Sequence, residues 1–270
     1  YLSFDSQGMP KVTLPFHADK RELPPAGSVW EYSSDGKQSS VLTLISRDKQ
    51  TATWRVGDSD FKEHLNSYSQ ILPDQPATDR QLLNFPLTLG KTWHTRYQFP
   101  VHVNQGNGHS WQYIYHASAD SRITGIAKIT VAAGSFDTVI ITRHIRWSKT
   151  NPQFSGPQAN EIHCKSKECR VSGYTFETLW YAPSVGRAVM KAIAINGMPE
   201  VWANDDQTIL QNPNALISEL VWFGKQAVTG GSASGSKYAH PLPASAFIQG
   251  FPLMMNNTAE FAMIHHPVIE

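Results

Sequence analysis

Apolar and polar residues alternate through most of the chain between residues 27 and 223. A period of two is typical of strands that bury one face, because successive side chains of a strand point to opposite sides. Turn residues such as Gly, Pro, Asn and Asp separate the alternating segments, so the pattern predicts about ten antiparallel strands. The segments are residues 30–32, 41–45, 52–56, 93–99, 111–115, 123–131, 139–147, 174–181, 187–195 and 216–223.

Helical signals are weak by comparison. No segment carries a sustained apolar stripe with the period of about 3.6 residues that an amphipathic helix shows, and the best helical candidates are short, at residues 60–69 and 205–210. Because alternating strand–helix–strand units are missing, the pattern predicts an all-β, mainly antiparallel fold. We expect a curled half-barrel or a β-sandwich, with few short helices and extended N- and C-terminal arms.

Hairpins and strand-borne aromatic residues are the most specific local predictions. Polar turns at residues 47–50 and 106–108 join neighbouring segments into two predicted hairpins. Alternation gathers the large aromatic side chains on sheet faces, where burying each of them contributes about 1.5–3 kcal/mol. The tryptophans that we expect to be largely buried are Trp54, Trp93, Trp111 and Trp180.

Composition divides the chain into four parts. Residues 1–26 contain four prolines and few periodic apolar positions, which predicts an extended N-terminal arm. Residues 27–223 form the predicted antiparallel β domain. Residues 224–237 include the run Thr-Gly-Gly-Ser-Ala-Ser-Gly-Ser, typical of a flexible linker. Residues 238–270 lack Lys and Arg and form a predicted apolar C-terminal docking tail.

The apolar tail at residues 238–270 is expected to pack against a surface. Left in water, so many large apolar side chains would be an aggregation hazard. Two locations remain open: the protein's own sheet, or another subunit, for which a Met-rich surface is well suited. The predicted ligand- or partner-binding residues are Phe247, Phe251, Leu253, Met254, Met255, Phe261 and Met263.

Overall composition excludes several classes of partner. The chain of 270 residues carries 23 Lys+Arg against 22 Asp+Glu, a net charge of +1, and the basic residues are scattered. No basic patch marks a nucleic-acid binder. No apolar run approaches the roughly 20 residues of a spanning helix, so we predict no transmembrane segment.

Two cysteines bear on the cellular compartment. Cys164 and Cys169 enclose four polar residues, a spacing that lets a disulfide close a hairpin loop. Two free thiols remain an alternative, as does a metal site with Glu161 and His163, although the spacing lacks the paired Cys-x-x-Cys motifs of structural zinc. A disulfide fits an oxidising compartment. The chain opens at Tyr1, as a processed or trimmed chain does, so we predict a periplasmic or extracellular protein.

Motifs for catalysis and cofactors are missing. The sequence contains no Gly-x-Ser-x-Gly, no His-Glu-x-x-His, no phosphate loop and no dinucleotide fingerprint, so we predict no catalytic residue, no metal and no cofactor. Histidines at positions 94, 116 and 144 fall within predicted strands, where surface or hydrogen-bonded imidazoles are expected. Catalytic groups can still converge from different strands. An enzyme site of this kind would use Arg143, His144, Arg146 and Glu177.

Several motifs give the chain a family resemblance. They are Gly-Ser-Val-Trp-Glu-Tyr at 27–32, Phe-Pro-Leu-Thr-Leu-Gly-Lys-Thr-Trp at 85–93, Val-Ala-Ala-Gly-Ser-Phe-Asp-Thr at 131–138, Trp-Tyr-Ala-Pro-Ser-Val-Gly at 180–186 and Glu-Leu-Val at 219–221. In this order they resemble uncharacterised β-rich periplasmic or envelope proteins of Gram-negative bacteria, which are distantly similar to the lipoprotein-carrier superfamily. The resemblance implies an open half-barrel with an apolar concave face, and it supplies no catalytic residues.

These observations favour a non-catalytic envelope protein that acts as a binding or accessory module. Binding would use an apolar concavity of the sheet, the C-terminal tail, or both. The expected partners are a protein bound through residues 238–270, or an apolar ligand or lipid. Two alternatives remain: an enzyme with the dispersed site named above, and a structural subunit of a larger envelope assembly.

Overall fold

The computed structural model describes residues 3–4, 10–11, 19–34, 38–71, 80–106, 109–155, 170–196 and 214–225. In these ranges all regular secondary structure is β, and no helix is present that could cross a membrane. The strands are β1 (Ser3–Phe4), β2 (Pro10–Lys11), β3 (Ser28–Ser34), β4 (Gln38–Arg47), β5 (Thr51–Val56), β6 (Ser59–His64), β7 (Ser69–Ile71), β8 (Thr92–Gly106), β9 (His109–Val131), β10 (Gly134–Ser155), β11 (Val171–Ala182), β12 (Arg187–Asn196) and β13 (Asn214–Lys225).

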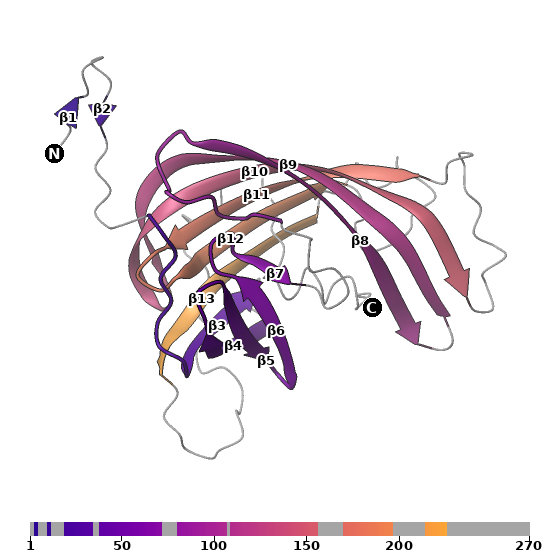
Figure 1. The fold of residues 1–270 in the computed structure, drawn as a ribbon, viewed down its shortest axis with the longest axis horizontal. Coiled ribbons are helices and arrows are strands. Elements are labelled where there is room, and N and C mark those ends of the chain that lie inside the picture. Colours follow the sequence, from indigo (N-terminus) through magenta and orange to yellow (C-terminus); the bar gives the residue numbers. More distant parts are fainter. Residues whose placement is uncertain are drawn as a thin grey trace.

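Eleven of these strands form one antiparallel sheet, in the order β7-β6-β5-β4-β3-β13-β12-β11-β10-β9-β8 (Figure 1). Strands β3 to β7 run to one edge, and β13 back through β8 run to the other, while β1 and β2 pair separately. The two edge strands are not paired with each other, so the sheet remains open. The predicted all-β, antiparallel half-barrel is therefore confirmed.

The helical candidate at residues 60–69 is wrong. This segment contains β6, a turn and β7, and β6 pairs with β5 from Val56 opposite Ser59 to Thr51 opposite His64. Gly57 lies at φ 55°, in the left-handed region that glycine adopts readily, and it begins the tight turn between the two strands. Pairing with β5 thus overrides the weak local helical signal. The other helical candidate, residues 205–210, lies outside the described residues.

The predicted hairpins and buried tryptophans are largely confirmed. Strands β4 and β5 pair across the first predicted turn, and β8 and β9 pair across the second. Trp54, Trp93 and Trp180 are 0%, 8% and 6% exposed. The side chain of Trp111 lies outside those that the structure describes. The boundaries proposed for the arm, domain, linker and tail remain predictions.

Contacts between distant strands show that one face of the sheet is concave. Glu63 on β6 pairs with Arg187 on β12, although β5, β4, β3 and β13 lie between these strands in the sheet. Trp30 and Tyr32 on β3 likewise donate hydrogen bonds to the carbonyl oxygens of Val185 (3.1 Å) and Ala188 (2.8 Å). The sheet must curl to bring these groups together, and Figure 1 shows the curl. We call the concave side the inner face.

The inner face of β8–β11 carries two apolar clusters. The middle cluster combines side chains of β8–β12 with Leu82, Leu83 and Leu87 from the segment that precedes β8. The far-end cluster lies further along β8–β11, away from the β9–β10 turn, and all its members come from these four strands. The members are Tyr97, Phe99, Val101, Tyr113, Ala117, Ala119, Ile145, Trp147 and Val171, with Tyr115 packed against them.

Candidate functional site

A buried charged group separates the middle cluster from the far-end cluster. Arg143 on β10 lies directly opposite Glu177 on β11, and the two form an ion pair. Lys191 on β12 reaches the other carboxylate oxygen of Glu177, with Nζ 2.9 Å from Oε1. Arg143 Nε also donates to Ser121 Oγ at 3.3 Å. The strand register therefore brings a carboxylate and two cations together inside the curl.

The Glu177 carboxylate is held in its ionised form. Burial by itself would raise its pKa, but the positive charges of Lys191 and Arg143 outweigh burial and lower the pKa to about 2. A general acid or base works best with a pKa near the working pH. Glu177 is therefore suited to holding Arg143 and Lys191 in place and poorly suited to proton transfer at neutral pH.

The four residues of the enzyme site considered from the sequence lie on two different faces of the sheet. Arg143 and Glu177 meet on the inner face, whereas His144 and Arg146 lie on the opposite face because neighbouring residues of a strand alternate. There His144 stacks on Phe176, with ring centroids 4.4 Å apart, and Arg146 pairs with Asp120 on β9 at 3.1 Å. The four residues do not form one site.

A Ser–His–Asp arrangement occurs on the outer face, and the sequence alone did not reveal it. His94 Nδ1 lies 2.6 Å from Asp120 Oδ1, and Ser118 Oγ lies 3.4 Å from His94 Nε2. Arg96 Nε donates to the same His94 Nε2 at 3.2 Å, in competition with the serine. The arrangement is best described as an exposed hydrogen-bond network.

The histidines that the sequence singled out occupy ordinary strand positions. His94 takes part in the network just described, His116 Nε2 lies 2.9 Å from Thr150 Oγ1, and His144 stacks as stated above. These contacts agree with the expectation of surface or hydrogen-bonded imidazoles. Among the described residues, no group of three or more His, Cys, Asp or Glu side chains could hold a metal ion.

The far-end cluster is a continuous aromatic surface. The ring of Phe99 lies 6.3 Å from that of Tyr97 and 5.2 Å from that of Tyr115, which in turn lies 6.3 Å from Trp147. Lys149 is fully buried at its margin, with Nζ 5.0 Å from the Tyr113 ring and 5.5 Å from that of Trp147. Both distances suit cation–π attraction.

The side chains of the far-end cluster are buried: its nine members are at most 7% exposed. The guanidinium of Arg80 lies 5.4 Å from the ring of Tyr97. The cluster consists of aromatic and aliphatic side chains, which suit contact with apolar groups.

The site residues predicted in the tail lie outside the described residues, as do Cys164 and Cys169. The predicted disulfide therefore remains a prediction. Sequence reasoning named Arg143 and Glu177 within its alternative site but missed the far-end cluster. The available signal was the alternation of aromatic residues in two segments predicted to pair, residues 93–99 and 111–115.

The buried carboxyl of Glu219 provides a test of the packing on the side of the sheet opposite Lys191, because Glu219 pairs with Met190 and Ser218 pairs with Lys191. Glu219 on β13 is buried, its Oε2 has no hydrogen-bond partner, and burial raises its pKa. A raised carboxyl pKa means that stability is greatest below the ordinary carboxyl pKa and falls as the pH rises through the raised value. We expect Glu219→Gln to raise Tm at pH 8 by about 2–4 °C, since 1 kcal/mol corresponds to roughly that shift in a domain of this size.

Melting curves between pH 4 and pH 8 would check this expectation. The gain in Tm should shrink toward pH 4, where Glu219 becomes protonated in the wild type. Glu22→Gln is the control because the Glu22 side chain is 73% exposed. An equal effect of both substitutions at every pH would contradict the expectation.

The chain was compared with family models, curated proteins and solved structures. No family model matches the chain, and no curated protein matches it. The chain is similar to the solved structure of the hypothetical lipoprotein YmcC from Escherichia coli, with 11% identity and a TM-score of 0.36 over 76% of this chain and 89% of that chain.

Two further solved structures are similar at the same level. One is a protein from Bacteroides fragilis assigned as exported, with a YmcC-like fold: 10% identity, TM-score 0.34, covering 77% of this chain and 100% of that chain. The other is a protein from Parabacteroides distasonis assigned as a lipoprotein: 14% identity, TM-score 0.36, covering 76% of this chain and 99% of that chain. The descriptions of the three proteins state lipoprotein or exported protein and give no function.

Proposed function

We propose that this protein is a non-catalytic, exported envelope protein that binds an apolar ligand on the far-end cluster of its inner face. One observation carries the proposal: apolar side chains from β8–β11 alone gather into one cluster on the inner face, and four of their rings follow one another at 5.2–6.3 Å. Concave surfaces lined by aromatic and aliphatic side chains are typical sites for apolar ligands. The exported location is supported by the sequence resemblance.

The chemistry of the inner face favours binding over catalysis. Its most prominent ionisable group, Glu177, is held as a carboxylate between two cations and has no free proton to transfer at neutral pH. The neighbouring far-end surface offers rings and aliphatic groups, which gain free energy when they bury apolar area.

Saturable binding of an apolar fluorescent probe would test the proposal. We expect N-phenyl-1-naphthylamine to bind the wild-type protein with a fluorescence increase that saturates at one site. Val101, in the far-end cluster, is 1% exposed. Val101→Thr keeps the side-chain shape but replaces a methyl group by a hydroxyl without a hydrogen-bond partner. This change should weaken probe binding about five- to tenfold.

The matched control is Val139→Thr. Val139 is fully buried on the same face but belongs to the middle cluster. Its replacement should disturb folding to a similar degree while leaving probe affinity unchanged. Equal loss of affinity in the two variants, or the absence of saturable binding to the wild type, would overturn the proposal.

A further inference from the structure

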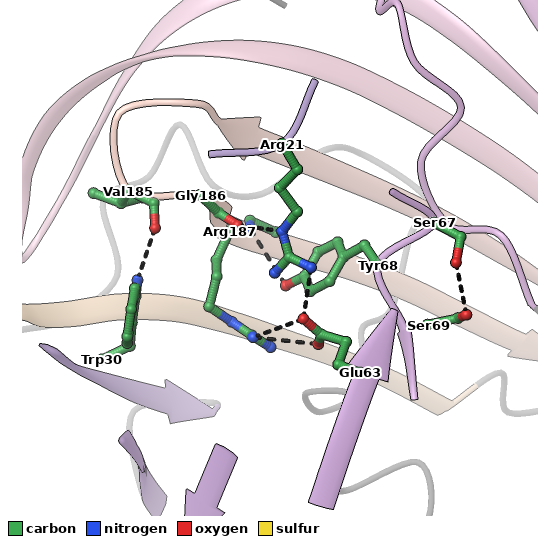
Figure 2. A network of polar contacts seen from close by, with 10 residues as sticks. Arg21, Trp30, Glu63, Ser67, Tyr68, Ser69, Val185, Gly186 and Arg187 are labelled. Carbon is green, nitrogen blue, oxygen red and sulfur yellow. Dashed lines mark hydrogen bonds and ion pairs between the residues drawn. The ribbon is translucent and has the colours of Figure 1, made fainter. Parts of the chain in front are cut away.

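A second buried charged group forms between the segment that precedes β3, strand β6 and the start of β12 (Figure 2). Arg21 precedes β3, Glu63 lies on β6 and Arg187 begins β12. Arg21 Nη1 lies 2.6 Å from Glu63 Oε1, and Arg187 Nη1 lies 3.3 Å from Glu63 Oε2. Arg21 Nε also donates to the carbonyl oxygen of Gly186 at 2.8 Å. All three charged side chains are at most 3% exposed.

The group carries an excess positive charge. Two guanidiniums share one carboxylate, which leaves a net charge of +1 in the core. Tyr32 and Tyr181 do not neutralise this charge, because burial raises the pKa of each phenol far above neutrality. A buried charge without a counterion is expensive. Aromatic faces offset part of this cost: the Arg21 guanidinium lies 4.2 Å from the Tyr68 ring centroid, and that of Arg187 lies 4.3 Å from Trp54.

Three buried donors in this group lack an acceptor. Arg21 Nη2, Arg187 Nε and Tyr181 Oη have no hydrogen-bond partner. The Tyr181 hydroxyl lies within the electrostatic influence of both arginines. Buried polar groups of folded proteins are nearly always satisfied by protein, water or an ion. The donors need an acceptor, and the excess positive charge needs a counterion. One negatively charged acceptor would meet both needs.

We propose that this cluster binds one small monovalent anion of the halide class, held by the unpartnered donors of Arg21, Arg187 and Tyr181. A single negative charge matches the net +1 of the side chains. The anion must be small because the surrounding side chains are buried. The bound anion would stabilise the packing of Arg21, and of the residues that precede β3, against the inner face of the sheet. This site is independent of the far-end cluster and of the function proposed for it.

Thermal unfolding of the full chain tests the proposal. Tm is measured in sodium chloride and in sodium gluconate at equal ionic strength, so that general screening is the same. A ligand that binds only the folded state raises Tm in a saturable way. We expect chloride to raise Tm by about 3 °C or more between 1 and 200 mM relative to gluconate.

Variants locate the effect. Arg21→Met leaves Arg187 and Glu63 as a neutral pair and should abolish the difference between chloride and gluconate. Tyr181→Phe removes one donor and should raise the chloride concentration at half effect about fivefold. Arg55→Met is the control, because it removes the same charge from an exposed pair with Asp60 and should keep the full chloride effect.

A direct measurement keeps the test independent of whether Arg21→Met folds. Crystals of the wild-type protein grown with sodium bromide should show one anomalous peak within hydrogen-bond distance of Arg21 Nη2. Equal Tm values in chloride and gluconate would overturn the proposal. A water molecule, or no density, in place of the bromide peak would overturn it as well.

Discussion

Glu177→Gln is expected to lower the free energy of unfolding by about 3–5 kcal/mol, because it leaves two buried cations without their shared counterion. Glu177 is fully buried and pairs with both Arg143 and Lys191. Glutamine keeps the shape of the side chain and can still accept hydrogen bonds. The decrease in the free energy of unfolding therefore measures mainly the effect of removing the negative charge. Urea unfolding followed by circular dichroism at pH 7 measures it.

The same substitution has a predicted pH dependence. Because the folded-state pKa of Glu177 is lowered to about 2, the stabilisation is fully present above the ordinary carboxyl pKa of about 4.3 and is lost as the pH falls through the lowered value. The difference between wild type and variant should therefore shrink between about pH 4 and pH 2.

Asp60→Asn provides the matched control for Glu177→Gln. Asp60 forms a close ion pair with Arg55, but that pair is exposed to solvent, where ion pairs contribute little. We expect no measurable change in the urea midpoint. If Glu177→Gln were as mild as this control, the charged group between the middle and far-end clusters would not support the inner face.

Removing residues 229–270 is the second change with a large expected effect. The segment removed contains every large apolar side chain of the predicted docking tail, and burying each contributes about 1.5–3 kcal/mol. We expect Tm to fall by about 5 °C or more, with no change in oligomeric state, if the tail packs on its own sheet. Differential scanning calorimetry and light scattering measure the two quantities.

The outcome of the truncation also separates two placements of the tail. Packing on another subunit predicts dissociation of an oligomer into folded monomers with little change in monomer stability. Removing only residues 265–270 is the control, because it leaves all the predicted docking residues in place and should change neither quantity. A protein unchanged in stability, oligomeric state and probe binding after removal of 229–270 would contradict the tail's predicted role.

The strands, the hairpins and the burial of three tryptophans could be predicted from the sequence because they follow from local steric rules. A strand exposes its side chains with a period of two whatever it pairs with. The alternation in residues 93–99 and 139–147 therefore marked strands directly, and the turn residues between strands marked the hairpins. Trp54, Trp93 and Trp180 were expected to be buried because large aromatic side chains on one face of a strand gain free energy there.

Only the tertiary structure decided which of these residues meet. Alternation alone places Arg143 and Arg146 on opposite faces, but only the curl decides that Arg143 faces inward, and only the register places it opposite Glu177. Residues 60–64 form a strand because β5 supplies their backbone hydrogen-bond partners, which their own sequence does not encode.

The curl of the sheet decided which residues meet across its inner face. Arg21 reaches Gly186 across 165 positions of sequence, and the far-end cluster forms from four strands that alternate in the same way as strands elsewhere in the sheet. The physical reason is the range of each interaction: strand and turn propensities act over a few residues, whereas register and curvature depend on the pairing and packing of the whole sheet.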